Sequence, residues 1–131
     1  MIGATNRPFD LDEAALRRLT KRIYIGLPDA GAREGQIQKL LSSVTTKISK
    51  KEMSQIVLAT NGYSSADLTA LVKEVAMCPL REIPPSSIVN MNSKDLRPVN
   101  KKDFIESIKV MPPSVSQASI NEYVQWNENT K

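Results

Sequence analysis

Apolar residues recur at helical spacing through most of the chain beyond residue 28. One set occupies positions i, i+3, i+4 and i+7, the spacing that gathers side chains on one face of a helix: Ile37, Leu40, Leu41 and Val44. A wider stripe has the same periodicity: Leu68, Leu71, Val72, Val75 and Ala76. Two shorter sets follow the same rule: Met53, Ile56 and Val57, then Phe104, Ile108 and Met111. The pattern predicts a small domain made of about four helices.

Polar residues mark where these helices begin. Three pairs have the spacing of a capping box, in which each side chain bonds the backbone of the other residue: Ser49 with Glu52, Ser64 with Asp67, and Asn100 with Asp103. Ser116 is expected to cap a last helix, on which Ile120, Tyr123, Val124 and Asn127 share a face. Pro79 is expected to kink or end the helix that starts at Ser64, unless it opens a new turn with Leu80 and Arg81.

The first 28 residues have a different pattern. Residues 1–6, MIGATN, are an apolar run that ends in polar residues, and residues 22–27, RIYIGL, alternate like a strand. Between them, Asp10 or Asp12 can cap a helix through residues 12–20, DEAALRRLT. Two strands are too few for a stable sheet. We therefore expect a mixed fold, in which these strands and their helix belong to the edge of a larger α/β sheet.

Composition and charge exclude several kinds of chemistry. The chain of 131 residues has no histidine, which excludes serine–histidine and cysteine–histidine catalysis within it. Its single cysteine, Cys78, excludes an internal disulfide and a cysteine-based zinc site. The net charge of +4 would suit an acidic partner, although an ordinary solvated surface explains the same balance and is favoured. The residues at the start do not have the pattern of a signal peptide.

A few polar residues are candidates for chemistry. Asn6 stands at the end of the first predicted strand, where α/β sheets bind ligands, although asparagine is also common in loops such as the one before Pro8. Arg17 and Arg18 stand in the last turn of the first predicted helix. Arginine offers a fork of donors that matches phosphate oxygens, but a basic pair at a helix end also compensates the helix dipole. Spacing alone favours the structural explanation for all three residues.

Two further residues have the same ambiguity. Arg81 follows the apolar stripe and could reach a phosphate, or pair with Glu74 or Glu82 at the surface. Trp126 is the only tryptophan and is expected to anchor the last helix through its buried area.

The segments together resemble a known family. Residues 2–29, IGATNRPFDLDEAALRRLTKRIYIGLPD, resemble the second region of homology of AAA ATPases, in the group that includes spastin, katanin and fidgetin. Residues 61–82, NGYSSADLTALVKEVAMCPLRE, resemble the small helical subdomain of that group, and residues 103–131 resemble its C-terminal helix region. Spastin looks nearest, but Leu19 after the arginine pair is more like fidgetin-like proteins.

The resemblance implies a fold and a division of the chain. Residues 1–28 would form the end of the large α/β subdomain, residues 29–115 the small helical or lid subdomain, and residues 116–131 a C-terminal helix. Cys78 stands where the family tends to have glycine, so the family's backbone conformation cannot be carried over to this position.

The resemblance also implies roles for individual residues. Asn6 matches the sensor-1 position, which responds to the γ-phosphate and the attacking water, and Arg17 and Arg18 match the arginine fingers, which act on ATP in the next subunit of a hexamer. Gly62, Tyr63, Ser64, Ser65 and Ala66 match the segment near adenine. Arg81 matches an arginine that approaches the nucleotide or the subunit boundary.

The implied function is ATP hydrolysis with Mg²⁺ coupled to microtubule severing, in the cytoplasm with the cytoskeleton, with the nucleus as an alternative location. The chain has neither a G-x-x-x-x-G-K-[ST] loop nor an apolar strand ending in Asp-Glu, so we expect it to hydrolyse no ATP and to bind no cofactor or metal by itself. Tubulin is the expected partner, and nucleic acid is not favoured. Two alternatives remain: a fidgetin-like remodeller with another client, and a non-enzymatic helical interaction module.

Overall fold

The computed structural model describes residues 1–130, except for the side chain of Ser93. The chain divides into two compact units, one made of Met1–Gly26 with the segment from Gln117 onward, the other made of Leu27–Ser116. The first unit contains the short 3₁₀ helix η1 (Pro8–Asp10) and the helices α1 (Glu13–Arg18) and α7 (Gln117–Asn129). The second contains α2 (Ala30–Leu41), α3 (Lys50–Ala59), α4 (Ser65–Arg81), α5 (Pro85–Ile88), η2 (Ser93–Asp95) and α6 (Lys101–Val110).

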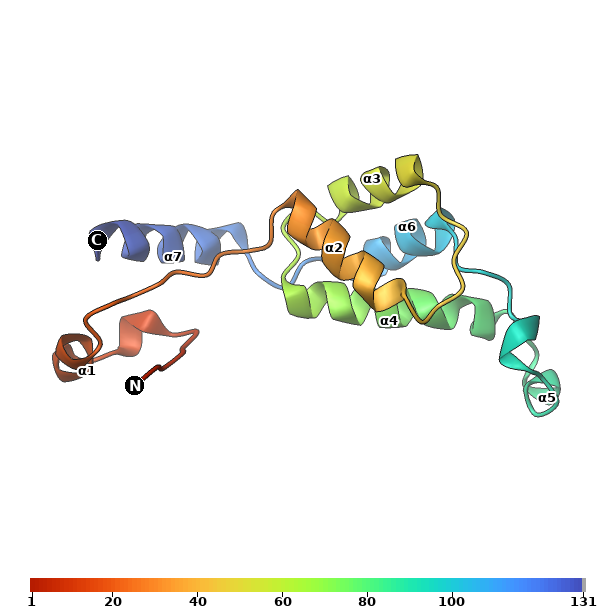
Figure 1. The fold of residues 1–131 in the computed structure, drawn as a ribbon, viewed down its shortest axis with the longest axis horizontal. Coiled ribbons are helices and arrows are strands. Elements are labelled where there is room, and N and C mark those ends of the chain that lie inside the picture. The colour runs from red at the N-terminus through yellow and green to blue at the C-terminus, as the bar shows by residue number, and fades with distance from the viewer. Residues whose placement is uncertain (131) are drawn as a thin grey trace. The chain divides into compact units, whose positions relative to one another are not determined.

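Four helices enclose the core of the unit Leu27–Ser116. Helix α4 packs against α2 and α6, and α3 packs against the same two helices, so each of the four touches two others (Figure 1). The core side chains come from all four helices and from the segments between them: Ile37, Leu41, Met53, Ile56, Val57, Tyr63, Leu68, Leu71, Val72, Val75, Val99 and Phe104. The predicted apolar stripes thus face a common interior, as the four-helix interpretation requires.

Capping explains where these helices begin. All three predicted capping boxes are formed: Ser49 with Glu52, Ser64 with Asp67, and Asn100 with Asp103. Of the two predicted caps for the first helix, Asp12 is the one used, because its Oδ1 accepts the Ala15 N–H at 2.7 Å. Each of these side chains satisfies a backbone donor that has no partner inside the helix.

The two predicted strands are not formed. Residues 1–5 and 19–29 have no regular secondary structure, and Ile2, Ile23 and Ile25 are exposed rather than buried in a sheet. A strand exists only through hydrogen bonds to a neighbouring strand. Within residues 1–130 the only such pairing is an isolated parallel bridge between Thr46 and Val99, in the other unit. A local sequence pattern can therefore favour a strand, but it does not record whether a neighbouring strand is there to pair with it.

Three details of the helical unit bear on the sequence analysis, and in the first of them its expectation was wrong. Helix α2 ends at Leu41, so Val44 is not on it and reaches the core from the following turn. Helix α4 does not end at Pro79 but continues to Arg81, which agrees with the alternative of a further turn with Leu80 and Arg81, and Pro79 is buried. The connection that begins at Pro84 contains two short helices, α5 and η2, which the sequence analysis did not predict.

No helix in the described part of the chain is long and apolar enough to cross a membrane.

Candidate functional site

Asn6 lies in a short loop that is held to α7. The carbonyl oxygen of Asn6 accepts a hydrogen bond of 2.6 Å from the hydroxyl of Tyr123. The ring of Phe9 stacks on the ring of Tyr123, with a centroid distance of 5.6 Å and an interplanar angle of 30°. Thr5 Oγ1 accepts the Arg7 N–H at 2.9 Å, which tightens the loop on either side of Asn6. The backbone of Asn6 is thus fixed, while its side chain is exposed.

Arg17 and Arg18 occupy the last turn of α1 and are both exposed. Arg17 is 3.6 Å from the carboxylate of Glu13 one turn earlier, and the two side chains are 82% and 90% exposed. An ion pair of this length at such exposure holds the arginine only weakly. The segment that follows is tied back to the helix, because Arg22 Nη2 donates to the Leu16 carbonyl at 3.2 Å. Both guanidinium groups can therefore reorient toward an anion outside the chain.

The segment from Gly62 to Ala66, termed the Gly62–Ala66 turn, consists of the turn that precedes α4 and the first two residues of that helix. Gly62 has φ of +85°, a conformation that favours glycine. Tyr63 is buried and its hydroxyl donates to the Met111 carbonyl, so its side chain belongs to the core rather than to an open surface. Burial, and then the charge of Asp67, raise the pKa of Tyr63. The other members of the segment are partly or fully exposed, so any ligand would meet their backbone and the small side chains of Ser64, Ser65 and Ala66.

Arg81 ends α4 and makes one of the surface pairings that the sequence analysis left open, the one with Glu74. Its guanidinium makes two hydrogen bonds to the carboxylate of Glu74, with Nη1 to Oε1 and with Nη2 to Oε2, the second at 3.1 Å. The bonds from Arg81 lower the pKa of Glu74. Glu82, the other candidate partner, binds a different arginine.

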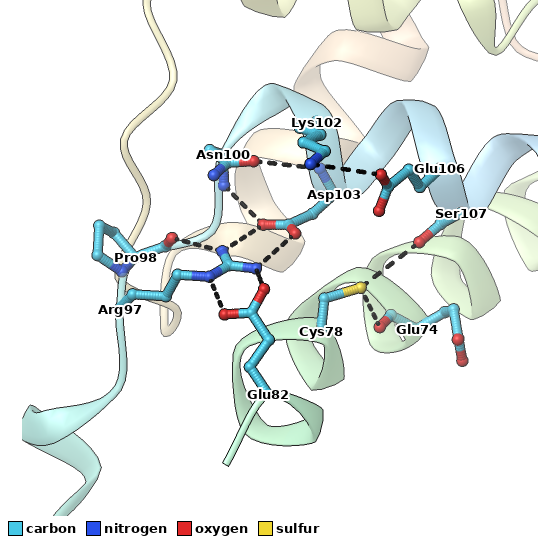
Figure 2. A network of polar contacts seen from close by, with 10 residues as sticks. All are labelled: Glu74, Cys78, Glu82, Arg97, Pro98, Asn100, Lys102, Asp103, Glu106 and Ser107. Atoms are coloured by element: carbon cyan, nitrogen blue, oxygen red, sulfur yellow. Dashed lines mark hydrogen bonds and ion pairs between the residues drawn. The ribbon is translucent and has the colours of Figure 1, made fainter.

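That other arginine is Arg97, which the sequence analysis missed. Its guanidinium bonds the carboxylate of Glu82 through two contacts of 2.6 Å and that of Asp103 through two contacts of 2.8 Å (Figure 2). Asp103 is buried, and the hydrogen bonds from Arg97 lower its pKa although burial opposes the shift. Bonds from Arg97 likewise lower the pKa of Glu82. No spacing rule could have found this cluster, because Glu82 and Arg97 are brought together by the path of the intervening chain.

A second arginine that the sequence analysis missed is buried. Arg33 is 5% exposed and bonds only backbone carbonyls, those of Pro28 and Val57, each at 3.0 Å. Its Nε has no hydrogen-bond partner among residues 1–130. Arg33 therefore ties the start of α2 to the end of α3, a structural task that its place on a polar stretch of sequence did not suggest.

The predicted site residues fall into separate groups. Asn6, Arg17 and Arg18 belong to the unit that contains the N-terminus, whereas Gly62–Ala66 and Arg81 belong to the helical unit. Within the helical unit, Ser65 and Arg81 are the two ends of α4. A helix of that length separates its ends by roughly 24 Å at 1.5 Å per residue, so Arg81 is not close to the Gly62–Ala66 turn. No cluster of side chains suited to a metal ion occurs in the part of the chain that the structure describes.

Comparisons of the sequence with protein families and with curated proteins agree with one another. Residues 52–105 match the AAA+ lid domain. The chain is 45% identical to spastin of Danio rerio over 127 residues, which cover 97% of this chain and 22% of that protein. It is 41% identical to spastin of Homo sapiens over 129 residues, which cover 98% of this chain and 21% of that protein. The chain therefore spans about a fifth of the length of these curated relatives.

Solved structures of related domains are similar over nearly the whole chain. The FIGL-1 AAA domain in complex with ADP matches with a TM-score of 0.94 at 39% identity, covering 98% of this chain and 44% of that one. A katanin structure that explains katanin self-assembly matches with a TM-score of 0.80 at 28% identity, covering 95% of this chain and 45% of that one. The matched region thus includes the irregular N-terminal segment.

Proposed function

Because the chain belongs to the AAA ATPases, as the C-terminal part of an AAA domain of the spastin, katanin and fidgetin group, we propose that it serves ATP hydrolysis and microtubule severing in a larger protein. The observation that carries the proposal is the identity of 41–45% to spastins over almost the entire chain. The parent would work in the cytoplasm on the cytoskeleton, as a ring of identical subunits, with tubulin as its client.

In this proposal Arg17 and Arg18 act on ATP bound to a neighbouring subunit. An arginine supplied in this way neutralises charge on the transferring phosphoryl group and accelerates hydrolysis by about 10³ to 10⁵. Both side chains are exposed, and Arg17 has only a weak contact to Glu13. This supports the role, because such an arginine must extend from the surface of its own subunit to reach the phosphate.

The other proposed roles concern the nucleotide of the same subunit. Asn6 would orient the attacking water through its exposed amide. The Gly62–Ala66 turn would lie near adenine and contact it through backbone groups, since the side chain of Tyr63 is committed to the core. Arg81 would approach the nucleotide or the subunit boundary after giving up its contact with Glu74. ATP and Mg²⁺ would be held mainly by other residues of the parent protein.

The arginine roles can be tested in the intact ATPase. Arg17→Ala and Arg18→Ala are each expected to lower the steady-state rate of ATP hydrolysis by about 10³ in a pure mutant assembly while ATP still binds, because only the transition state loses the charge. Mixing with wild-type subunits should restore part of the rate. Lys21→Ala removes a nearby positive charge as a control and should hydrolyse ATP normally. Wild-type rates from both arginine variants would remove the finger assignment.

A second candidate is a fidgetin-like remodeller whose client is not the microtubule. The similarity to the FIGL-1 AAA domain and the leucine at position 19 favour it. The two candidates share the ATP chemistry and differ in client. Incubating the intact ATPase with ATP and fluorescent microtubules separates them: severing that disappears when the acidic tubulin tails are removed supports the first, and intact microtubules support the second.

A further inference from the structure

The hydroxyl of Tyr123 links α7 to the loop that carries Asn6. Tyr123 and Asn6 are 117 positions apart in sequence, yet the hydroxyl is 2.6 Å from the Asn6 carbonyl oxygen. We propose that Tyr123 is a positioning residue for Asn6, and that α7 thereby controls how well the Asn6 amide is placed for hydrolysis. The inference rests on the proposed role of Asn6.

The contact acts on the backbone of Asn6 and leaves its side chain available. The Asn6 side chain is exposed and forms no hydrogen bond within residues 1–130. Its amide therefore keeps its donors and its acceptor for a water or a phosphate oxygen. Because the Tyr123 hydroxyl fixes the carbonyl, the direction of the Asn6 side chain depends on two side-chain torsions rather than on a mobile loop.

Other contacts restrain the loop on both sides but none replaces the Tyr123 bond. Pro8 is buried, its ring fixes its own φ, and it restricts the conformation of Arg7 before it. Stacking between Phe9 and Tyr123 brings the phenol ring over the loop. Stacking fixes the position of the ring, whereas only the hydroxyl bonds the peptide group of Asn6 itself. Removing the hydroxyl alone should therefore loosen Asn6 while α7 stays in contact with Phe9.

The rate of hydrolysis is the sensitive measure of such loosening. A displacement of a catalytic group by about 1 Å can lower a rate by roughly a hundredfold. If the free energy of a single neutral hydrogen bond were lost entirely from the transition state, the rate would fall about twofold to tenfold. Binding of ATP in the ground state does not require the attacking water to be aligned, so KM for ATP should change little.

The experiment compares four variants of the intact ATPase with the wild type: Tyr123→Phe, Asn6→Ala, the double variant, and Tyr24→Phe. Tyr24→Phe deletes the same atom in the same unit, from a tyrosine whose hydroxyl makes no hydrogen bond in the described chain, and should behave as wild type. Tyr123→Phe is expected to lower kcat about twofold to tenfold with KM for ATP nearly unchanged. Asn6→Ala is expected to lower kcat by at least about tenfold.

The double variant decides the mechanism. If Tyr123 acts through Asn6, adding Tyr123→Phe to Asn6→Ala lowers kcat no further, because there is no amide left to position. Losses that multiply would overturn the inference, since they would mean that the hydroxyl supports the fold or the assembly by another route. Wild-type kcat in Tyr123→Phe, with a slow Asn6→Ala, would also overturn it and leave the proposed role of Asn6 standing. Wild-type kcat in Asn6→Ala would instead remove the proposed role of Asn6, and the inference with it.

Discussion

The guanidinium groups of Arg97 and Arg33 both bind acceptors within the protein, but the acceptors differ in charge. Arg97 bonds two carboxylates, one of which, on Asp103, is buried. Arg33 bonds only two carbonyls at the junction of α2 and α3. A buried carboxylate without its cation is costly, because the charge has been taken out of water and lost its compensation. The stability of the helical unit should therefore depend more on Arg97 than its partly exposed position suggests.

Arg97→Met is expected to lower the free energy of unfolding at neutral pH by about 2–3 kcal/mol, because Asp103 is left buried with only the backbone donor of its own capping box. The effect should depend on pH. The folded-state pKa of Asp103 is lowered by Arg97, so its contribution is complete above the ordinary carboxyl pKa of about 4 and is lost as pH falls through the folded value. Urea unfolding at several pH values measures both effects.

Lys102→Ala serves as the control for the Arg97 variant. Lys102 also forms an ion pair on α6, with Glu106 at 3.7 Å, but the two side chains are 79% and 60% exposed. Its removal should leave the unfolding midpoint almost unchanged. If Arg97→Met lost as little stability as Lys102→Ala, or if the loss persisted undiminished in acid, the cluster would not be held by the charge of Asp103.

At the scale of elements, the sequence predicted where the main helices of the bundle begin. It did not predict structure that depends on contacts between distant segments of the chain. The capping boxes at Ser49, Ser64 and Asn100 formed because each depends only on residues three positions apart. Among the candidate site residues, the turn at Gly62 and the place of Arg17 and Arg18 at the end of α1 could also be predicted from residues close in sequence. The Tyr123 contact, the Arg97 cluster and the absence of paired strands depend on distant segments, which local periodicity does not record.

Substitution of Gly62 and of Gly35 by alanine should change the stability of the helical unit in opposite directions. Gly62→Ala is expected to destabilise the chain by about 1 kcal/mol, because φ of +85° strains an L residue although nothing within 4 Å obstructs the new Cβ. Gly35→Ala lies in the middle of α2, also without an obstructing atom, and should stabilise by up to about 1 kcal/mol. Thermal unfolding of the two variants measures the signs, and equal signs would mean that one of the two backbone conformations is assigned wrongly.

At the scale of the whole molecule, the two units differ in how they are stabilised. The hydrophobic core cluster lies between Ile37 and Phe104, within Leu27–Ser116. The other described unit is held by the stacking of Phe9 on Tyr123 and by single hydrogen bonds, and it exposes Ile23 and Ile25. The solved AAA domains that match are more than twice as long as this chain.

The chain shortened to Leu27–Ser116 is therefore expected to fold by itself. A core with four mutually packed helices should unfold cooperatively, with a urea m-value near 1 kcal/mol/M for a domain of this size. Far-ultraviolet circular dichroism follows its helices directly. In the whole chain, the fluorescence of Trp126 reports on the other unit. A broad, non-cooperative transition of the shortened chain would show that the helical unit needs residues outside it.

The bridge between Thr46 and Val99 has a practical consequence. Val99 exchanges hydrogen bonds with Thr45 and Lys47 at 2.9 and 2.8 Å, and Arg97 fastens the same stretch to Glu82. In the segment between Glu82 and Arg97, Ile88 and Val89 lie at the surface. Because the ends of this segment are held together independently of its length, a fluorescent reporter could be inserted near residue 89 with little cost to the core, and used to follow the protein in living cells.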